Sequence, residues 1–348
     1  MAKRTATLIP TRKRAKGAGA MAKRAAELTP TKSPKKKVKK EKAPLCCEPL
    51  STGALFAIGG DDAAHALVRA ELVRRPSARN RSPYVADIRL ADGREAICHV
   101  PSFDLGGKCV AGSALLVKPA LDAKGALVGP DAVSPKYGTP KCEFHCQLAV
   151  LPGGGYVGAH PLLGETAAVA LLQKSTVLAD VWAGTRTDAE IRREVTAPRA
   201  QDMRADFVVS GGAAKETVLE VKTVVDASID EGVDAGEAGG PVAALFPWGK
   251  KNQKGPAGEK VVSARAIKHV DALAAIQKEG VAAAAVLFVV ARADADSFRP
   301  HAARCPTFAA HLKEAKAADV NILARRLRWD VRGGVALAFD DGAIPVDV

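Results

Sequence analysis

Three ionisable side chains stand on two neighbouring apolar runs of the sequence. Asp206 heads one short run, and Glu220 and Lys222 lie in the run 218–222. Because side chains alternate between the two faces of a strand, Glu220 and Lys222 point the same way. Residues 210–216 between the runs have the Ser, Gly and Ala typical of a hairpin turn. Two carboxylates and an ammonium on one sheet face could hold a divalent metal and orient a water, as metal-dependent phosphodiester cleavage requires.

The same residues also have a plainer explanation. At average residue usage, roughly one Glu-x-Lys appears by chance in a chain of this length. On an exposed strand it would be a solvated ion pair. The apolar residues around Glu220 instead favour an interior strand, where a charge needs a partner or a role.

Length, composition and charge limit the classes of protein to which the chain can belong. The chain has 348 residues, enough for about two domains, and 47% of them are hydrophobic. No apolar run is as long as a membrane span, so we expect a soluble protein. Residues 1–44 contain 15 Lys and Arg and two Glu, which accounts for the whole net charge of +13. The neutral remainder gives no argument from charge that the globular part binds nucleic acid.

Residues 1–64 are predicted to form a basic tail and a linker. The first 44 lack hydrophobic periodicity, so we expect them to be disordered. The basic run 33–40 follows a Ser-Pro step and resembles a nuclear-import signal, which predicts a nuclear protein. An organellar transit peptide is the alternative, because the tail is poor in acids and rich in hydroxyls. Such a polycation would also bind nucleic acid by counterion release.

The seven cysteines are scattered and contain no Cys-x-x-Cys motif. This odd number favours reduced thiols in an intracellular compartment. Cys142 and Cys146 flank His145 and could form half of a zinc site, but no second half is visible. Their neighbours instead predict a strand.

Residues 65–155 are predicted to form a small β domain. Apolar runs at 84–90 and 95–100 flank a tight Ala-Asp-Gly turn, and two more follow at 112–117 and 142–151. Short strands with this turn spacing suggest a small OB-like barrel.

The remaining residues, 156–348, predict alternating helices and strands that pack into an α/β sheet. The expected elements are a helix at 165–174, a short helical or extended element at 188–195, strands at 205–209 and 218–222, a helix from Ser263 to 280, a strand at 283–291, a helix at 307–318 and a strand at 320–327. Between them, residues 226–260 are rich in Gly, Asp and Lys and predict a long, mobile insertion.

Several segments together resemble the SfsA (sugar fermentation stimulation) family over roughly residues 66–330, most specifically in the second half. The segments are 193–195, 204–207, 219–224, 244–247, 264–270, 286–292, 296–300 and 305–308. The resemblance implies an OB-like N-terminal domain followed by a PD-(D/E)xK nuclease-like mixed sheet with flanking helices, in a DNA-binding protein. The expected fold class is therefore α/β, in a chain of two domains that together have an α+β organisation.

The resemblance also implies roles for individual acidic and basic residues. Glu194 matches an acid that the family carries on a helix, and Asp206 matches the first strand acid. Glu220 and Lys222 match the Glu-x-Lys. The implied active site therefore consists of these four residues.

A basic cluster on the next helix is implied by the same resemblance. Arg265, Lys268 and His269 match it, and residues at i, i+3 and i+4 share one helix face, which could hold a phosphate. Without the resemblance, Arg265 and Lys268 would only keep the helix soluble, and His269 would pack on Leu273.

Three departures from the family pattern concern regions outside those four positions. Residues 101–104 replace the family's Asn-Thr-Gly, and Trp248 replaces a polar residue after Phe-Pro. The 226–260 insertion is longer than the family's connection. They put the ligand contacts of the first domain in question.

The expected function is nucleic-acid binding, with DNA as the partner, together with an Mg²⁺-dependent phosphodiesterase site. Asp206 and Glu220 would ligate the metal, because carboxylate and water ligands suit Mg²⁺ and no His/Cys set competes. Glu194 would hold a metal-bound water or a second ion. Lys222 would orient or deprotonate the attacking water.

Two other functions stay open at this point. The chain could be a non-catalytic DNA-binding or regulatory protein that keeps the nuclease fold. A sugar-metabolism regulator is the third possibility, but the 4% aromatic content offers few stacking surfaces for sugars or for unpaired bases.

Overall fold

The computed structural model describes residues 52–100, 105–160, 162–196, 203–231 and 241–348. The basic run 33–40, Cys46 and Cys47, and the departures at 101–104 lie outside these ranges. None of the helices within them is long and apolar enough to cross a membrane.

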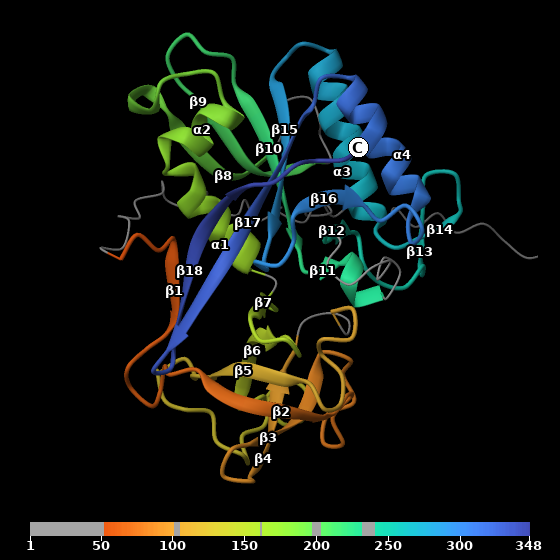
Figure 1. The fold of residues 1–348 in the computed structure, drawn as a ribbon. Helices are drawn as coiled ribbons and strands as arrows, with labels where there is room; N and C mark the ends of the chain where they lie inside the picture. The colour runs from red at the N-terminus through yellow and green to blue at the C-terminus, as the bar shows by residue number, and fades with distance from the viewer. Residues whose placement is uncertain (1–51, 101–104, 161, 197–202, 232–240) are drawn as a thin grey trace, which may run out of the picture. The chain divides into compact units, whose positions relative to one another are not determined.

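The first sheet closes into a barrel. Its strands follow the order β4-β3-β2-β5-β6-β7, and a parallel pairing of β4 with β6 closes the first five (Figure 1). This closed five-stranded arrangement confirms the predicted OB-like barrel. The strands are β2 (Val68–Arg74), β3 (Val85–Leu90), β4 (Glu95–His99), β5 (Ala114–Pro119), β6 (Phe144–Val150) and β7 (Tyr156–Gly158).

The barrel core contains three of the seven cysteines. Cys98, Cys109 and Cys146 are buried among its alanine, leucine and isoleucine side chains, and the five described cysteines are free thiols. Burial raises the pKa of Cys98 well above its ordinary value. No group of three or more His, Cys, Asp or Glu within the described residues could hold a metal ion, so the zinc half-site gains no support. Cys146 lies on β6, as the strand prediction required.

The second sheet is mixed, with seven strands in the order β1-β18-β17-β15-β10-β9-β8. β10, β15 and β17 run parallel, and the outer pairings are antiparallel. The strands are β1 (Phe56–Gly59), β8 (Glu190–Thr196), β9 (Arg204–Ser210), β10 (Thr217–Val224), β15 (Ala283–Val290), β17 (Asn321–Arg332) and β18 (Val335–Ala343). β1 lies in the segment predicted to be a linker. Its pairing partner β18 is at the far end of the sequence, so no local pattern predicted this strand.

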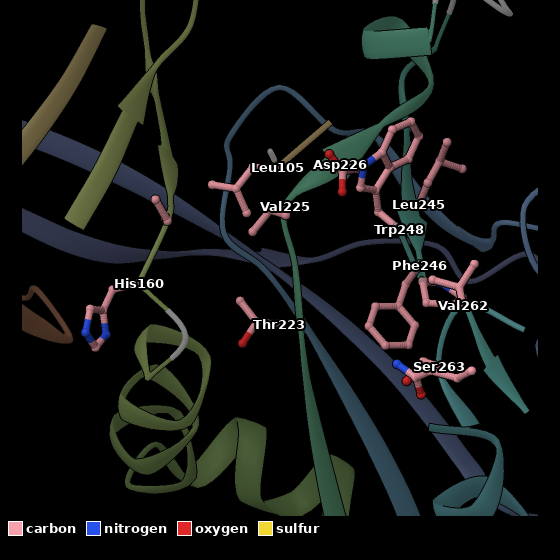
Figure 2. Close-up of a pocket in the computed structure, with 14 residues that line it drawn as sticks. Leu105, His160, Thr223, Val225, Asp226, Leu245, Phe246, Trp248, Val262 and Ser263 are labelled. Carbon is pink, nitrogen blue, oxygen red and sulfur yellow. The ribbon is translucent and has the colours of Figure 1, made fainter. Parts of the chain in front are cut away.

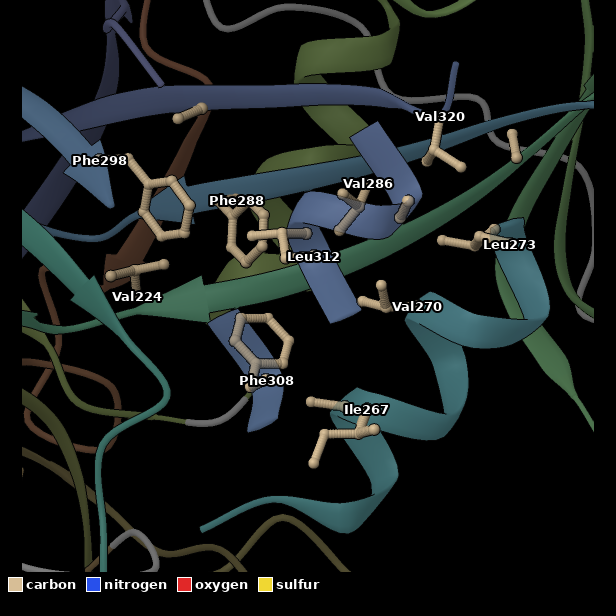
Figure 3. Packing of buried hydrophobic residues seen from close by; sticks show 14 of the residues in the cluster. Val224, Ile267, Val270, Leu273, Val286, Phe288, Phe298, Phe308, Leu312 and Val320 are labelled. Atoms are coloured by element: carbon tan, nitrogen blue, oxygen red, sulfur yellow. The ribbon is translucent and has the colours of Figure 1, made fainter. Parts of the chain in front are cut away.

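Helices cover both faces of this sheet (Figure 1). On one face are α1 (Leu163–Leu172) and α2 (Ser175–Val181), and on the other are α3 (Ala264–Lys278) and α4 (Pro306–Ala317). α3 begins where predicted, since the N–H of Ala266 donates to Oγ of Ser263 at 3.3 Å. Figure 3 shows Ile267 and Val270 of α3 meeting Phe308 of α4 over the sheet. This packing fixes which side of α3 faces the strands.

The described part of the predicted insertion at 226–260 contains short strands, although its sequence shows little periodicity. The strand β12 (Ala243–Phe246) is largely buried and pairs in parallel with β16 (Ser297–Pro300). Its partner lies about fifty residues away in sequence, so local periodicity gave no signal. The other elements are η1 (Arg186–Asp188), which precedes β8, and β11 (Asp226–Ala227), η2 (Ser228–Glu231), β13 (Gln253–Lys254) and β14 (Lys260–Val261).

Candidate functional site

The hairpin of β9 and β10 brings Asp206 and Glu220 to the same place. Leu219 pairs with Phe207, so the next pair would be Glu220 and Asp206, but the ladder stops there. Instead, the N–H of Val221 donates to Oδ2 of Asp206 at 2.8 Å. The aspartate side chain therefore replaces a backbone acceptor, and the strands part at the two acids.

The turn of this hairpin depends on a glycine. Gly211 has φ of +139°, which favours glycine, and its backbone lies against the carbonyl of Asp188, where a Cβ would not fit. The predicted turn at 210–216 is thus confirmed with a specific steric reason. It fixes the register that aligns the two acids.

Glu220 is the most buried acid of the site, with 2% of its surface exposed. Its Oε1 accepts hydrogen bonds from Nζ of Lys222 and, with Nδ1 protonated, from His269. Its Oε2 has no hydrogen-bond partner among the described residues. A buried carboxylate oxygen without a donor is costly. It marks a position where a cation would be stabilising.

His269 lies on the side of α3 that faces the sheet, away from solvent. Nε of Arg265 donates to Nε2 of His269 at 3.3 Å, which leaves Nδ1 as the donor to Glu220. Arg265 and Lys268 are exposed, whereas His269 is buried. The structure therefore divides the predicted basic cluster: two side chains lie at the surface and one contacts the acid.

The pKa values of the two acids move in opposite directions. Burial and the charge of Glu220 raise the pKa of Asp206 to about 6, although the N–H of Val221 and the charge of Lys222 oppose the change. Burial would also raise the pKa of Glu220, but the hydrogen bond from His269 and the charge of Lys222 outweigh it, and that pKa lies below its ordinary value. Neighbouring carboxylates that repel each other in a buried place are a common feature of acid–base and metal sites.

Glu194 does not lie on a helix, so that part of the prediction is wrong. It is in β8, opposite Asp206 in the register but not paired with it, and has a left-handed backbone with φ of +51°. NH2 of Arg204 donates to its Oε2 at 2.9 Å. The segment forms a strand because its neighbours pair with β9. A non-glycine residue with positive φ is uncommon and adds local strain.

The acid carried by a helix next to the site is Glu165, which sequence reasoning missed. It occupies the first turn of α1 and forms an ion pair with Arg193 of β8. Its negative charge is one of the causes that raise the pKa of Asp206. The available signal was an acid at the start of the predicted helix 165–174, just before the strands that carry the other acids.

The donor set fits a hard divalent cation. Asp206 and Glu220 offer carboxylate oxygens, one of them unpartnered, and Val221, whose N–H donates to Asp206, directly follows Glu220 in the chain. Two protein carboxylates would leave the remaining positions to waters or phosphate oxygens, which is the arrangement that Mg²⁺ prefers. The described part of the chain adds no third His, Cys, Asp or Glu to this pair.

A cavity of about 240 Å³ lies at the end of β10 (Figure 2). Thr223 and Val225 form its floor, and Phe246 and Ser263 line one side with His160 on the other. Thr223 directly follows Lys222, so the cavity adjoins β10, the strand that carries Glu220 and Lys222.

A buried ion pair ties a barrel loop to the same end of β10. Nζ of Lys108 donates to Oδ1 of Asp226 at 2.8 Å, and Asp226 is 1% exposed. The two residues are 118 positions apart. The pair therefore holds the loop that contains Leu105 against β11, which follows β10 in the chain.

Comparisons with known proteins find relatives of a single family. The family model "Sugar fermentation stimulation protein RE domain", where RE denotes restriction-endonuclease-like, matches residues 260–333. The sugar fermentation stimulation protein homolog of Thioalkalivibrio sulfidiphilus is 30% identical over 277 residues, covering 78% of this chain and 93% of the relative. The homolog of Symbiobacterium thermophilum is 29% identical, covering 76% and 90%.

A solved structure has the same fold. The Pyrococcus furiosus SfsA structure, solved in complex with Ca²⁺, superposes with a TM-score of 0.59 at 18% identity, covering 85% of this chain and 99% of that one. This likeness supports the barrel and the curled mixed sheet.

Proposed function

Since the chain belongs to the sugar fermentation stimulation protein family and contains its restriction-endonuclease-like domain, we propose that it binds DNA and hydrolyses phosphodiesters with Mg²⁺. One observation carries the proposal. Where β9 and β10 part, Asp206 and Glu220 lie together, Oε2 of Glu220 has no partner among the described residues, and Lys222 lies on the same strand face.

Each residue of this centre has a distinct role in the proposal. Asp206 and Glu220 would hold Mg²⁺, helped by the carbonyl of Val221. The bound metal would polarise a phosphoryl oxygen and lower the pKa of a coordinated water. Lys222 would orient the attacking water and stabilise the negative charge that develops on the phosphate.

Neighbouring residues would support this centre without touching the reacting atoms. His269 holds Oε1 of Glu220 in place. Arg265 and Lys268, exposed on α3, would contact nearby phosphates of the DNA backbone. Glu194 or Glu165 would bind a metal-coordinated water, and cleavage by the Gln variant of each acid separates the two.

A cleavage assay tests the proposal. Single-stranded, duplex and flap DNA are incubated with Mg²⁺ and either wild-type protein or Lys222→Ala. We expect cleavage by the wild type and a loss of at least about 10²-fold in Lys222→Ala, the scale seen when one charge-stabilising donor is removed. Cleavage by Lys222→Ala at the wild-type rate would refute the assignment.

A non-catalytic DNA-binding protein is the second candidate, and one observation favours it. Within the described chain no third His, Cys, Asp or Glu joins Asp206 and Glu220 as a possible metal ligand, and Lys222 is already bonded to Glu220. Titration calorimetry with Mg²⁺ beside the cleavage assay separates the two. Binding of the metal and of DNA without turnover on any of the three substrates would support the second candidate.

Nuclear localisation of the protein stays a prediction. It depends on the basic run 33–40, and the relatives compared above are bacterial, which gives nuclear import no support. Fluorescent fusions of the full chain with and without Lys35-Lys36-Lys37 would test it. Equal distribution of the two fusions would refute a nuclear-import role for the run.

A further inference from the structure

A second, larger groove of about 980 Å³ lies between the barrel and the segment after β12. From the barrel, Arg75 and Tyr84 line it, and Lys250 comes from the opposite side together with Arg304. None of the described residues that line it is acidic. A groove with this charge favours a polyanion.

Trp248 forms a wall shared by this groove and by the smaller cavity beside Thr223 (Figure 2). The guanidinium of Arg304 lies 4.3 Å from the centre of its ring. Trp248 is partly exposed, whereas Trp182 and Trp329 are buried. An accessible indole beside an arginine is a surface on which an unpaired base stacks.

Further rings continue this surface on the barrel. Tyr84 is 47% exposed and is nearly parallel to His99, with ring centres 6.5 Å apart, and His99 lies 5.6 Å from His145. Burial lowers the pKa of both histidines, which favours their neutral form. Tyr84 directly precedes β3 and His99 ends β4; these are the second and third strands of the barrel, which OB folds use for oligonucleotides.

We propose that this groove binds a single strand of nucleic acid, with Trp248 and Tyr84 stacking on unpaired bases and Arg75, Lys250 and Arg304 contacting phosphates. The proposal rests on the function proposed above and specifies its substrate. A duplex keeps its base faces stacked inside, where these rings cannot reach them. The groove selects for unpaired nucleotides.

The smaller cavity receives one base of that strand. Its volume of about 240 Å³ is below the roughly 300–1,000 Å³ of pockets for drug-sized ligands, so it suits a single base rather than a base pair. Its lining includes Thr223, next to Lys222, and Ser263, the cap of the helix that carries Arg265. A strand held this way reaches the acids of β9 and β10 with its backbone.

Tryptophan fluorescence tests the proposal directly. The full chain is titrated in EDTA with the oligonucleotide dT20 and with the dT20–dA20 duplex, because stacking on Trp248 quenches its emission and the other two tryptophans are buried. We expect quenching by dT20 and little by the duplex. Trp248→Phe should lose the quenching and still bind fluorescein-labelled dT20 within a few-fold of wild type by anisotropy.

Matched variants measure the contribution to affinity. Trp248→Ala should weaken dT20 binding roughly 5- to 150-fold, the range expected for one base–aromatic stack. Lys250→Ala should weaken it more than Arg332→Ala, which removes an exposed arginine that does not line the groove. All variants keep residues 1–44, so any binding by that segment is common to them.

The outcomes separate this inference from the proposed function. Wild-type binding of dT20 with unchanged fluorescence, and equal affinity in a folded Trp248→Ala, would overturn the groove alone. Equal quenching by dT20 and duplex would overturn the preference for a single strand. Wild-type protein that binds neither probe would overturn the DNA-binding function itself.

Discussion

Two buried carboxylates, Glu220 and Asp226, lie six positions apart in the chain and have different surroundings. Asp226 pairs with one lysine from a distant loop, which joins two parts of the fold. Glu220 shares one oxygen between Lys222 and His269 and also lies beside a second acid, Asp206. Burial of a charge alone does not mark a functional site, since structural pairs are also buried. The excess of negative charge around Glu220 is what distinguishes it.

The largest effect on stability should come from the structural pair. Lys108→Met removes the ammonium that donates to Oδ1 of the buried Asp226, so we expect the free energy of unfolding to fall by about 3–5 kcal/mol. Urea unfolding followed by circular dichroism measures this change. Mg²⁺ affinity of the folded variant should match wild type; a weaker affinity would show that the two carboxylates are coupled.

Asp206 should destabilise the metal-free protein at neutral pH. Its pKa is raised from 3.8 to about 6, so the ionised form is disfavoured in the folded state. This cost is absent below about pH 4, grows as the pH rises toward 6 and is complete above it. Asp206→Asn should therefore gain about 2–3 kcal/mol at pH 7.5 and little at pH 4. Urea unfolding in EDTA at both pH values checks this, and an equal change at both would contradict it.

His269 should act through Glu220, and two substitutions distinguish its ring nitrogens. Asn places an N–H near the position of Nδ1, whereas Gln places it near Nε2. Since Nδ1 faces Glu220, His269→Gln should weaken Mg²⁺ binding by about 10–100-fold and His269→Asn by less. Calorimetry measures both. The same loss in the two variants would mean that the hydrogen bond does not position the acid.

The smallest change should follow Glu194→Gln. Its pair with Arg204 is partly exposed, so the free energy of unfolding should change by less than about 1 kcal/mol. Glu165→Gln should reduce cleavage more, because Glu165 belongs to the helix and its charge acts on Asp206. Parallel cleavage assays decide between the two acids. A greater loss of cleavage in Glu194→Gln would mean that Glu194, and not Glu165, belongs to the active site.

Local signals in the sequence predicted much of the second sheet. The hairpin, the cap at Ser263 and the alignment of Asp206 with Glu220 depend on residues close in sequence, and all are present in the structure. The pairing of β1 with β18 and the Lys108–Asp226 pair join distant segments, which no periodicity encodes. His269 faces the sheet because of how α3 packs. Helical spacing alone grouped His269 with Arg265 and Lys268, which lie at the surface.

The central claim is that Asp206 and Glu220 form a metal-dependent phosphodiesterase centre. Cleavage of single-stranded DNA by wild-type protein and by Asp206→Ala, each in Mg²⁺ and in EDTA, tests it most directly. We predict that only the wild type in Mg²⁺ cleaves, while both proteins stay folded. Equal cleavage by Asp206→Ala in Mg²⁺, or cleavage by the wild type in EDTA, would contradict the claim.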